Sequence, residues 1–577
     1  MFFVDMRFAI ILGLIVFACF SAGVSAYDVI GGGVCDCGNC SDCNSALNDN
    51  ENCTTVRLSS DVSSPTSSCI NNPDNFNNKV FDCMNHWING SGQYHGVYAY
   101  AKENVTIQNC EVTNFWNGLN LYFPRGFIVR NNTLVENNRY DLRVWADGKE
   151  QCMFVMENNM GPEGRPILVY NSSFSLANAV ASQLVLCAAD NSSVVNVTVV
   201  GSSSLDNNGI DVFVTDDSNF TDVNSSDNYY GIYFLRSNNN RVEGSIFNSN
   251  LWDGVYLWDA PTIISDNTML YNGRYDLGGT IGTTCNSVVT GNTGTGGLPI
   301  RFVNSAETVS DEVVSELILC QADDAVVRNV TLANVSGIKN NGVLMLNTNR
   351  ANITDVTSSS HYHGFNLDYC ADNVFLRPTA NGNDNDGFYF GSSVRNRVLN
   401  GTLVSNTRAG ISLTQSNYNN LSYNLVHFGW WGVYEYLSSN NTVEQNNVSA
   451  TSNMGVYLTS SPDGLVVGNT VNDGDQGIYV LNSDGVSVVN NTVNSNGFRG
   501  ISASGSDVVF NGNTACGNIN SDFYSSDWGA SSGDGNRCSL PDGWNDSGTS
   551  GCTYSCQESL VHLLYGGWNL LSLRLIA

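Results

Sequence analysis

The stretch GLVVGNTVNDGDQGIYVLNSDGVSVVNNTVNSNGFRGISA, residues 464–503, contains two copies of one short pattern. Gly477-Ile-Tyr-Val is followed 23 residues later by Gly500-Ile-Ser-Ala. The alternation after Gly477 places Ile478 and Val480 on one face of a strand and Tyr479 and Leu481 on the other. A unit this short cannot bury a face alone and must stack on copies of itself. The stretch therefore predicts a solenoid of stacked strands.

The same glycine-led strand recurs along most of the chain. It returns every 22 or 23 residues from Gly342 to Gly500, and earlier at Gly96, Gly118, Gly209, Gly231 and Gly254. If each unit forms one coil and pairs with the next in parallel, the fold class is all-β, a single-stranded parallel β-helix, which the crossover preference makes right-handed. We expect about 18 coils of 22–23 residues over residues 96–515, on the order of 85 Å at about 4.8 Å per coil. The predicted inward column is Val97, Leu119, Ile210, Ile232, Val255, Val343, Phe365, Phe388, Ile411, Val433, Val456, Ile478 and Ile501.

Asparagines recur at the same interval in the turns. Asn447, Asn469, Asn491 and Asn513 are each 22 residues apart. We expect their amides to stack into a structural ladder of hydrogen bonds.

A longer repeat is superimposed on the short one. Arg139-Tyr-Asp-Leu returns as Arg274-Tyr-Asp-Leu, and Cys152 and Cys187 return as Cys285 and Cys320, at offsets of 133 to 135 residues. We interpret residues around 142–208 and 277–341 as duplicated insertions, each closed by a disulfide. Unpaired buried thiols are the alternative.

The first 26 residues read as a signal peptide. An apolar run over residues 8–20 follows Arg7, and Val24-Ser-Ala26 is a small-residue cleavage site. Cleavage after Ala26 predicts a secreted, periplasmic or cell-surface protein; a permanent anchor is the alternative.

Cysteines gather at both ends of the mature chain. The motif CDCGNCSDC occupies residues 35–43, and in an exported protein such clusters are more often disulfides than zinc or iron–sulfur ligands. We therefore expect residues 27–95 to form a Cys-rich N-terminal cap and residues 516–556 to form a second disulfide-tied cap. One of the 17 cysteines outside the signal peptide must stay unpaired. Residues 557–577 resemble the start of a truncated β segment.

Charge limits the partners. The chain has 53 Asp and Glu against 24 Lys and Arg, a net charge of −29. This excess argues against nucleic acid and anionic membrane surfaces as partners. It leaves neutral glycans and divalent cations, with calcium as the cofactor to test.

The repeats resemble a known family. The Gly-Val-Tyr-Leu and Asn-Asn-Thr-Val coils, with Asn-Val-Thr-Ile-Gln-Asn-Cys at 104–110 and Phe-Asp-Cys-Met-Asn-His-Trp-Ile-Asn-Gly at 81–90, look like secreted right-handed β-helix proteins of the NosD-like, carbohydrate-binding and sugar-hydrolase (CASH) superfamily. The resemblance covers roughly residues 80–515. It implies the fold, but the same coil serves lyases, hydrolases, epimerases, adhesins and surface proteins.

The resemblance also raises copper, because NosD is a periplasmic copper-binding protein. Copper needs imidazole, thiolate or thioether ligands in one place. His361 and His363 share a turn, but His427 lies about three coils away. A copper site is therefore not expected.

An enzyme of the polysaccharide lyase, hydrolase or epimerase type is the second hypothesis. Glycoside hydrolysis needs two carboxylates across a sugar. The acids that such an activity would use are Asp216, Asp217 and Asp368, although we interpret the first two as a solvated turn. Glu435 falls at an inward position, for which we expect a local bulge.

Aromatic residues form an outward column that favours binding over catalysis. Flat aromatic faces beside Asp and Asn could hold sugar rings. Tyrosine also suits strands and pairs well in ladders, which is the structural alternative. We predict carbohydrate binding or a structural, adhesive role in the cell envelope, within a larger cell-surface assembly. The candidate ligand-binding residues are Tyr233, Tyr256, Trp258, Tyr389, Tyr434, Tyr436, Tyr457 and Tyr479.

Overall fold

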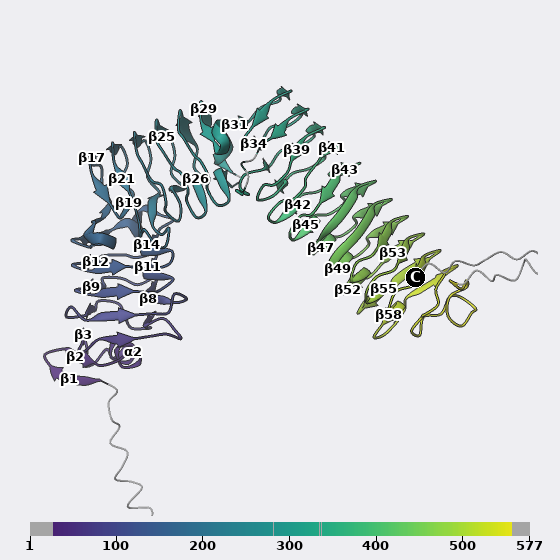
Figure 1. Cartoon of the computed structure of the whole chain (residues 1–577). Coiled ribbons are helices and arrows are strands. Elements are labelled where there is room, and N and C mark those ends of the chain that lie inside the picture. The colour runs from purple at the N-terminus through teal and green to yellow at the C-terminus, as the bar shows by residue number, and fades with distance from the viewer. Residues whose placement is uncertain (1–26, 281, 334, 336, 557–577) are drawn as a thin grey trace, which may run out of the picture. The chain divides into compact units, whose positions relative to one another are not determined.

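A computed structural model describes residues 27–280, 282–333, 335 and 337–556. The chain divides into two compact units (Figure 1): unit 1 is Met1–Gly273 with Leu277–Asn292, and unit 2 is Arg274–Asp276 with Thr293–Ala577. The predicted signal peptide at 1–26 and the β segment at 557–577 lie outside the described residues.

Unit 1 is built of parallel strands stacked coil on coil. The first sheet begins with β1, which pairs antiparallel with β2, and continues in parallel. Its strands are β1 (Asp28–Gly31), β2 (Val34–Cys37), β3 (Thr55–Leu58), β6 (Val80–Asp82), β9 (Thr106–Gln108), β12 (Phe127–Arg130) and β15 (Phe154–Glu157). Two further sheets of these coils contain β4 (Val62–Ser63), β7 (Trp87–Asn89), β10 (Glu111–Thr113) and β13 (Thr133–Val135), and β5 (Ile70–Asn71), β8 (His95–Tyr100), β11 (Asn117–Tyr122) and β14 (Tyr140–Trp145).

The later coils of unit 1 continue the same stacking. One sheet contains β16 (Ile167–Tyr170), β19 (Gln183–Cys187), β22 (Gly209–Phe213), β24 (Ile232–Leu235) and β26 (Asp253–Trp258). A second contains β17 (Ser175–Ala177), β20 (Ser193–Val195), β23 (Asn219–Thr221), β25 (Asn240–Glu243), β27 (Thr262–Ser265) and β29 (Val288–Thr290), and β18 (Val180–Ala181) pairs with β21 (Thr198–Val199).

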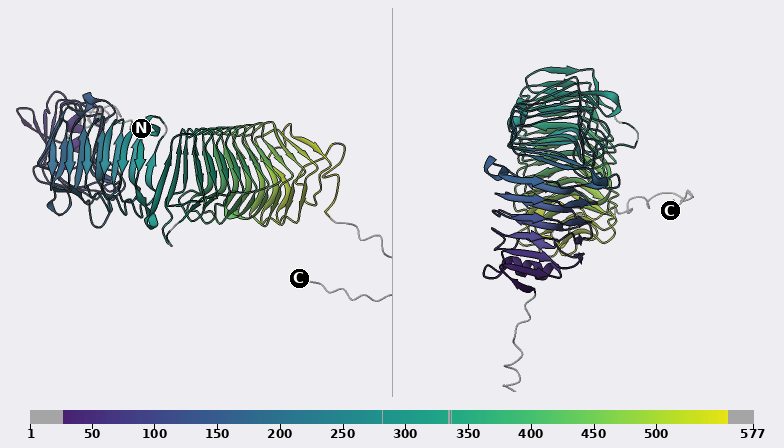
Figure 2. Two further views of the ribbon diagram at one scale, coloured as in Figure 1. Left: turned by 90° about the horizontal axis from the view of Figure 1, so that it is seen from above. Right: turned by 90° about the vertical axis from the view of Figure 1, so that its left-hand side faces the viewer.

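Unit 2 has the same construction, and its stacked strands are clearest in the left view of Figure 2. Its broadest sheet contains β30 (Thr293–Gly294), β31 (Leu298–Val303), β34 (Glu316–Cys320), β37 (Val343–Leu346), β40 (Phe365–Asp368), β42 (Asp386–Gly391), β44 (Thr402–Val404), β45 (Ala409–Thr414), β47 (Leu425–Tyr436), β49 (Asn447–Thr459), β51 (Thr470–Asn472), β52 (Gln476–Leu481), β54 (Thr492–Asn494), β55 (Arg499–Ser504), β57 (Thr514–Cys516) and β58 (Ser521–Ser525). A second sheet contains β32 (Thr308–Ser310), β35 (Val326–Arg328), β38 (Asn352–Thr354), β41 (Val374–Leu376), β43 (Arg397–Leu399), β46 (Asn420–Ser422), β48 (Thr442–Glu444), β50 (Leu465–Val467), β53 (Val486–Val489), β56 (Val508–Asn511) and β59 (Ser532–Asp534). A third contains β33 (Val313–Val314), β36 (Thr331–Leu332) and β39 (Thr357–Ser358).

The all-β parallel solenoid is therefore confirmed, but the number of coils is not. The chain forms about 23 turns rather than about 18. Parallel pairing already begins at β2 and β3, before Gly96, and β16 and β19 form coils inside the segment 142–208. These coils lack the glycine-led strand, so counting glycines missed them.

The glycine of the repeat is required by the close approach of successive coils. A Cβ built at Gly477 would lie 2.5 Å from the Gly500 carbonyl oxygen and 2.2 Å from Val493 Cγ1. At Gly432 it would lie 2.3 Å from the Gly455 carbonyl oxygen. The next residue of each strand then points inward, and every member of the predicted inward column is at most 1% exposed.

The asparagine ladder exists with one correction. Asn446, not Asn447, precedes Asn469: the Asn446 backbone N–H donates to Asn469 Oδ1 at 2.8 Å, and Asn469 donates in the same way to Asn491. This coil is 23 residues long, so the ladder position shifts by one and Asn447 becomes the exposed first residue of β49.

Disulfides close both ends, as predicted. At the N-terminus Cys35–Cys53, Cys37–Cys43 and Cys40–Cys69 surround the helix α2 (Cys40–Asn48), so the CDCGNCSDC motif is a disulfide knot. Cys516–Cys556 and Cys538–Cys552 tie the C-terminal cap. Cys83–Cys110 and Cys152–Cys187 link coils, and Cys285 and Cys320 are likewise disulfide-bonded. Within the described residues Cys370 is the free, buried cysteine.

Candidate functional site

The histidines are not arranged as a copper centre. His361 is buried, with Nδ1 2.8 Å from the Asn340 carbonyl oxygen and Nε2 3.2 Å from that of Leu332. His427 Nδ1 contacts Ser449 Oγ at 2.8 Å. No group of three or more His, Cys, Asp or Glu side chains in the described part of the chain is placed to hold a metal ion. These residues do not fit copper, because its ligands must converge.

The predicted acids fall in different places. Asp216 accepts the Asn238 backbone N–H at 2.7 Å and lies 3.7 Å from Lys149 Nζ, so it stabilises stacked turns. Asp217 is exposed at a turn with φ of 56°. Asp368 ends β40 on the outer face of unit 2, where partial burial raises the pKa of its carboxyl.

The predicted bulge at Glu435 is wrong. Glu435 keeps regular register between Leu413 and Leu458, and the irregularity of β47 lies between Gly429 and Trp431. Its side chain is fully buried, Oε2 accepts from Asn441 Nδ2 at 3.1 Å, and Oε1 has no hydrogen-bond partner. Burial raises the pKa of Glu435 to about 8. A buried carboxyl with so few hydrogen bonds destabilises the folded state. Because it lies inside the core, it cannot contact a ligand.

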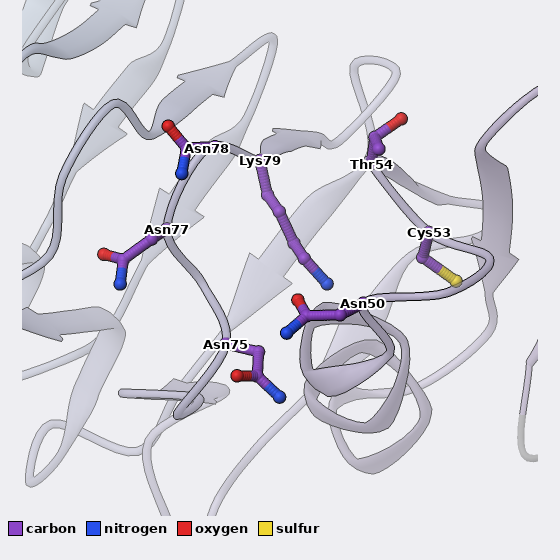
Figure 3. Close-up of a pocket in the computed structure, with 7 residues that line it drawn as sticks. All are labelled: Asn50, Cys53, Thr54, Asn75, Asn77, Asn78 and Lys79. Atoms are coloured by element: carbon purple, nitrogen blue, oxygen red, sulfur yellow. The ribbon is translucent and has the colours of Figure 1, made fainter.

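The N-terminal cap contains a polar pocket of about 370 Å³ (Figure 3). It is lined by Asn50, Cys53, Thr54, Asn75, Asn77, Asn78 and Lys79. Lys79 Nζ donates to the Asp49 carbonyl oxygen at 2.8 Å, and burial lowers the pKa of the amine. The lysine therefore supports the cap, and the pocket offers no aromatic ring to a ligand.

The outward column of unit 2 is formed as predicted by tyrosines on successive coils. Tyr434, Tyr457 and Tyr479 are register partners, with ring centroids 5.5 and 5.4 Å apart. Trp431 stacks on Tyr434 at 4.4 Å. The rings are half-buried, and Tyr436, two residues along β47, is 41% exposed. The surface is a ladder of rings with one face open to solvent.

Unit 1 gathers the other predicted aromatic residues into a cluster. Tyr233 and Tyr256 are register partners with stacked rings 5.5 Å apart. Trp145 of β14 lies 6.2 Å from Tyr233 and 5.9 Å from Trp258. Trp258 is 42% exposed, whereas Tyr233 is 5% exposed and its hydroxyl has no hydrogen-bond partner. Tyr256 and Trp258 thus form the accessible face, and Tyr233 lies beneath it.

Charged groups that the sequence did not indicate lie against this cluster. Asp211 precedes Tyr233 in the same column and accepts from Gln183 Nε2 at 3.3 Å. Burial raises the pKa of Asp211 to about 7, although Arg143 and Arg139 act in the opposite direction. The Arg143 guanidinium carbon lies 5.5 Å from the Trp145 ring centroid. Two arginines therefore face one weakly ionised acid.

A row of amides and a histidine extends the cluster toward the N-terminus. Asn120 is the register partner of Arg143 and lies 3.0 Å from His95 Nε2 through Nδ2. Asn117 and Asn120 are at most 2% exposed, yet their Oδ1 atoms have no hydrogen-bond partner. Burial, and secondarily Arg143, lowers the pKa of His95 to about 4. We define the unit 1 cluster as His95, Asn120, Arg139, Arg143, Trp145, Asp211, Tyr233, Tyr256 and Trp258.

Sequence reasoning missed the charged half of this cluster. Asp211 occupies the position after the inward Ile210, where Tyr233 and Tyr256 stand in the next coils, so an acid in an aromatic column was the available signal. Arg143 lies in β14, which lacks the glycine of the repeat, and no pattern pointed to it.

Comparison with known proteins supports the fold. The family described as periplasmic copper-binding protein (NosD) matches residues 304–473 and 431–540. No curated protein matches the chain. In the described residues no helix is both long and apolar enough to cross a membrane.

Solved structures match the chain only at low identity. The Azotobacter vinelandii mannuronan C-5 epimerase AlgE4 A-module is 12% identical over 83% of this chain and 90% of its own, with a TM-score of 0.21. Bacteriophage CBA120 tailspike protein 3 is 9% identical over 89% and 62%, with a TM-score of 0.18. The catalytic domain of a GH87 α-1,3-glucanase is 12% identical over 79% and 66%, with a TM-score of 0.15. These scores are too low to carry an argument about function.

The disulfides and the periplasmic family also agree on a location outside the reducing cytosol. The chain is therefore a parallel β-helix protein that is similar to the NosD family over residues 304–540.

Proposed function

We propose that this is an exported glycan-binding protein, released by cleavage after Ala26, which recognises polysaccharide through the unit 1 cluster. The observation that carries the proposal is the exposed Trp258 and the half-buried Tyr256 beside Asp211, Arg139 and Arg143.

The cluster combines the two features that a sugar site needs. Aromatic faces pack against the C–H face of a pyranose ring, and convergent polar groups fix its hydroxyls. The carbonyl oxygens of Asn117 and Asn120 and the Tyr233 hydroxyl are buried without partners. Since buried polar groups are almost always satisfied, a ligand or water supplies the missing bonds.

The charge balance of the cluster favours an acidic sugar. Arg139 and Arg143 act on Asp211, whose pKa of about 7 leaves it partly neutral. Arginine binds carboxylate and sulfate groups through charge-assisted hydrogen bonds. A positive site on a chain of charge −29 also keeps the acidic ligand from binding elsewhere.

The test is retention in affinity electrophoresis through gels that contain neutral or acidic polysaccharides, with calcium or with EDTA. We expect one acidic polysaccharide to retard the oxidised mature chain. Tyr256→Ala with Trp258→Ala should abolish the retardation while the chain keeps its folded circular dichroism spectrum. The control Tyr418→Asn removes a ring that is 59% exposed on a turn of unit 2, where the positive φ suits asparagine, and should change nothing.

Free migration in every gel would refute glycan binding and leave a structural role in a cell-surface assembly. Equal retardation of the double variant would show that the glycan binds outside the unit 1 cluster.

A polysaccharide-processing enzyme is the second candidate, favoured by the titration of Asp211. A pKa of about 7 beside the unpartnered Tyr233 hydroxyl is suited to proton transfer at neutral pH. Incubation with the retained polysaccharide should then release new reducing ends or unsaturated products, and Asp211→Asn should stop the release while retention persists. No release over a day would leave binding alone.

A further inference from the structure

The duplication places a second cluster on unit 2, at positions equivalent to those of unit 1. The strand Asp253-Gly-Val-Tyr-Leu-Trp258 returns as Asp386-Gly-Phe-Tyr-Phe-Gly391, at the offset of 133 residues. Tyr256 is thereby matched by Tyr389. Asp211 is matched by Leu344, and Trp258 by Gly391. The second copy therefore keeps the tyrosine ring but has other residues in place of the acid and the tryptophan.

Gly391 allows Asp368 to lie close to the retained tyrosine. A Cβ built at Gly391 would lie 2.9 Å from Asp368 Oδ1 and 3.3 Å from Tyr389 Cε1, so a side chain there would displace both groups. On the other side of Tyr389, the column continues with Ser412 before the next ring, Tyr434. A glycine therefore stands beside the Tyr389 ring where unit 1 has Trp258.

Polar groups surround the Tyr389 ring in a fixed arrangement. The Arg408 guanidinium forms a forked contact with the buried carboxylate of Asp386 and donates to Ser412 Oγ at 3.1 Å. Its Cζ lies 5.7 Å from the Tyr389 ring centroid. The His363 ring lies 5.5 Å from that of Tyr389; its Nδ1 is buried without a hydrogen-bond partner, 3.6 Å from Asp386 Oδ2.

We infer that unit 2 carries a second glycan site, formed by His363, Asp368, Asp386, Tyr389, Arg408 and Tyr434, which takes a neutral, hydroxyl-rich sugar. This rests on the proposed function and adds to it a second site of different ligand chemistry. The ring of Tyr389 supports one sugar face, and Asp368 and Arg408 meet its hydroxyls.

The charged groups of the unit 2 site favour a neutral sugar over an acidic one. Arg408 is already paired with Asp386, and Asp368 adds a second carboxyl beside Tyr389. An acidic sugar would meet Asp368 and compete with Asp386 for Arg408. A neutral hydroxyl, in contrast, can donate to a carboxylate and accept from an arginine at once, which suits this pair. In unit 1 Arg139 and Arg143 act on Asp211, whose pKa of about 7 leaves it partly neutral, so an acidic sugar can bind there.

The experiment is calorimetric titration of the oxidised mature chain with neutral oligosaccharides from β-glucan, xylan, mannan and dextran, and with oligogalacturonates. Unit 2 is perturbed by Tyr389→Ala and by Asp368→Asn, which is nearly isosteric. Unit 1 is perturbed by Tyr256→Ala and Arg143→Gln. Tyr418→Asn serves as the control for both, and circular dichroism checks that each variant keeps its fold.

We expect Tyr389→Ala and Asp368→Asn each to weaken a neutral ligand about tenfold and to leave oligogalacturonate unchanged, and the unit 1 variants to do the reverse. A neutral ligand that binds equally well to both unit 2 variants would overturn the second site and leave the proposed function standing. Binding of no glycan at all would overturn the proposed function, and the second site with it.

Discussion

Glu435 gives the sharpest test of the packing of unit 2. Its carboxyl is fully buried between Leu413 and Leu458, with one hydrogen bond from Asn441 and one oxygen without a partner. The pKa is about 8 in the folded chain and 4.5 for an ordinary glutamate. The folded state therefore binds the proton more tightly than the unfolded state, so stability is present in full below pH 4.5 and is lost progressively from there to pH 8.

The magnitude follows from the pKa difference. One pKa unit corresponds to about 1.4 kcal/mol, so the buried acid costs the folded state about 3 kcal/mol at pH 7 and about 5 kcal/mol at pH 9. Glu435→Gln has the shape of the protonated acid and keeps an acceptor for Asn441, yet does not ionise. The variant should match the parent near pH 4 and exceed its stability increasingly as pH rises.

The assay is urea unfolding of both proteins at pH 4, 7 and 9, followed by circular dichroism. The matched control is Glu444→Gln on the neighbouring strand β48, whose half-exposed side chain should yield no such gain. Parallel stability profiles for parent and Glu435→Gln would refute the reasoning, because they would mean that the carboxyl is equally solvated in both states.

Three further outcomes follow from the same structure. Asn469→Ala removes the acceptor of the Asn446 N–H and the donor to the Val443 carbonyl, so it should lower the free energy of unfolding by about 3 kcal/mol, whereas the exposed Asn447→Ala should change it little in the same urea experiment. Cys370 is buried and burial raises the pKa of its thiol to about 12, so a thiol reagent should label no cysteine of the described residues in the native, unreduced chain and one after denaturation; labelling of the native chain would contradict this. The affinity of the unit 1 cluster for an acidic oligosaccharide should fall severalfold between pH 6 and pH 8, because Asp211 ionises near pH 7 and offsets the arginines. Asp211→Asn should flatten that profile, and an unchanged profile in the variant would assign the pH effect to another group.

The fold was predictable because its causes are local and repeated. Each glycine such as Gly477 faces a carbonyl of the next coil, and each following residue points into the core. The pattern of one six-residue strand therefore predicts which residues of the neighbouring strands are buried. Coil number was not predictable, because β16 and β19 stack in the same way without that glycine. The predicted asparagine ladder was wrong by one residue at Asn447, because one coil is a residue longer and shifts the ladder position to Asn446.

The site was predictable only where it follows the repeat. Tyr256 and Tyr389 lie in the outward column as expected, since strand alternation fixes their direction. The proximity of Arg143 to Asp211 depends on how β14 and β22 are placed relative to each other. The repeat period of the sequence does not predict this placement. At Glu435 the sequence pattern led to a wrong prediction. We expected a backbone bulge, but the strand keeps its regular register and buries the carboxyl, whose pKa is raised to about 8.

The most direct test of the account is calorimetric titration of the mature chain and its Tyr256→Ala, Trp258→Ala double variant with the polysaccharide that retards it. We predict a loss of affinity of about tenfold or more in the double variant, with the circular dichroism spectrum of the folded chain retained. Equal affinity in the two proteins would contradict it and remove the unit 1 cluster as the glycan-binding site.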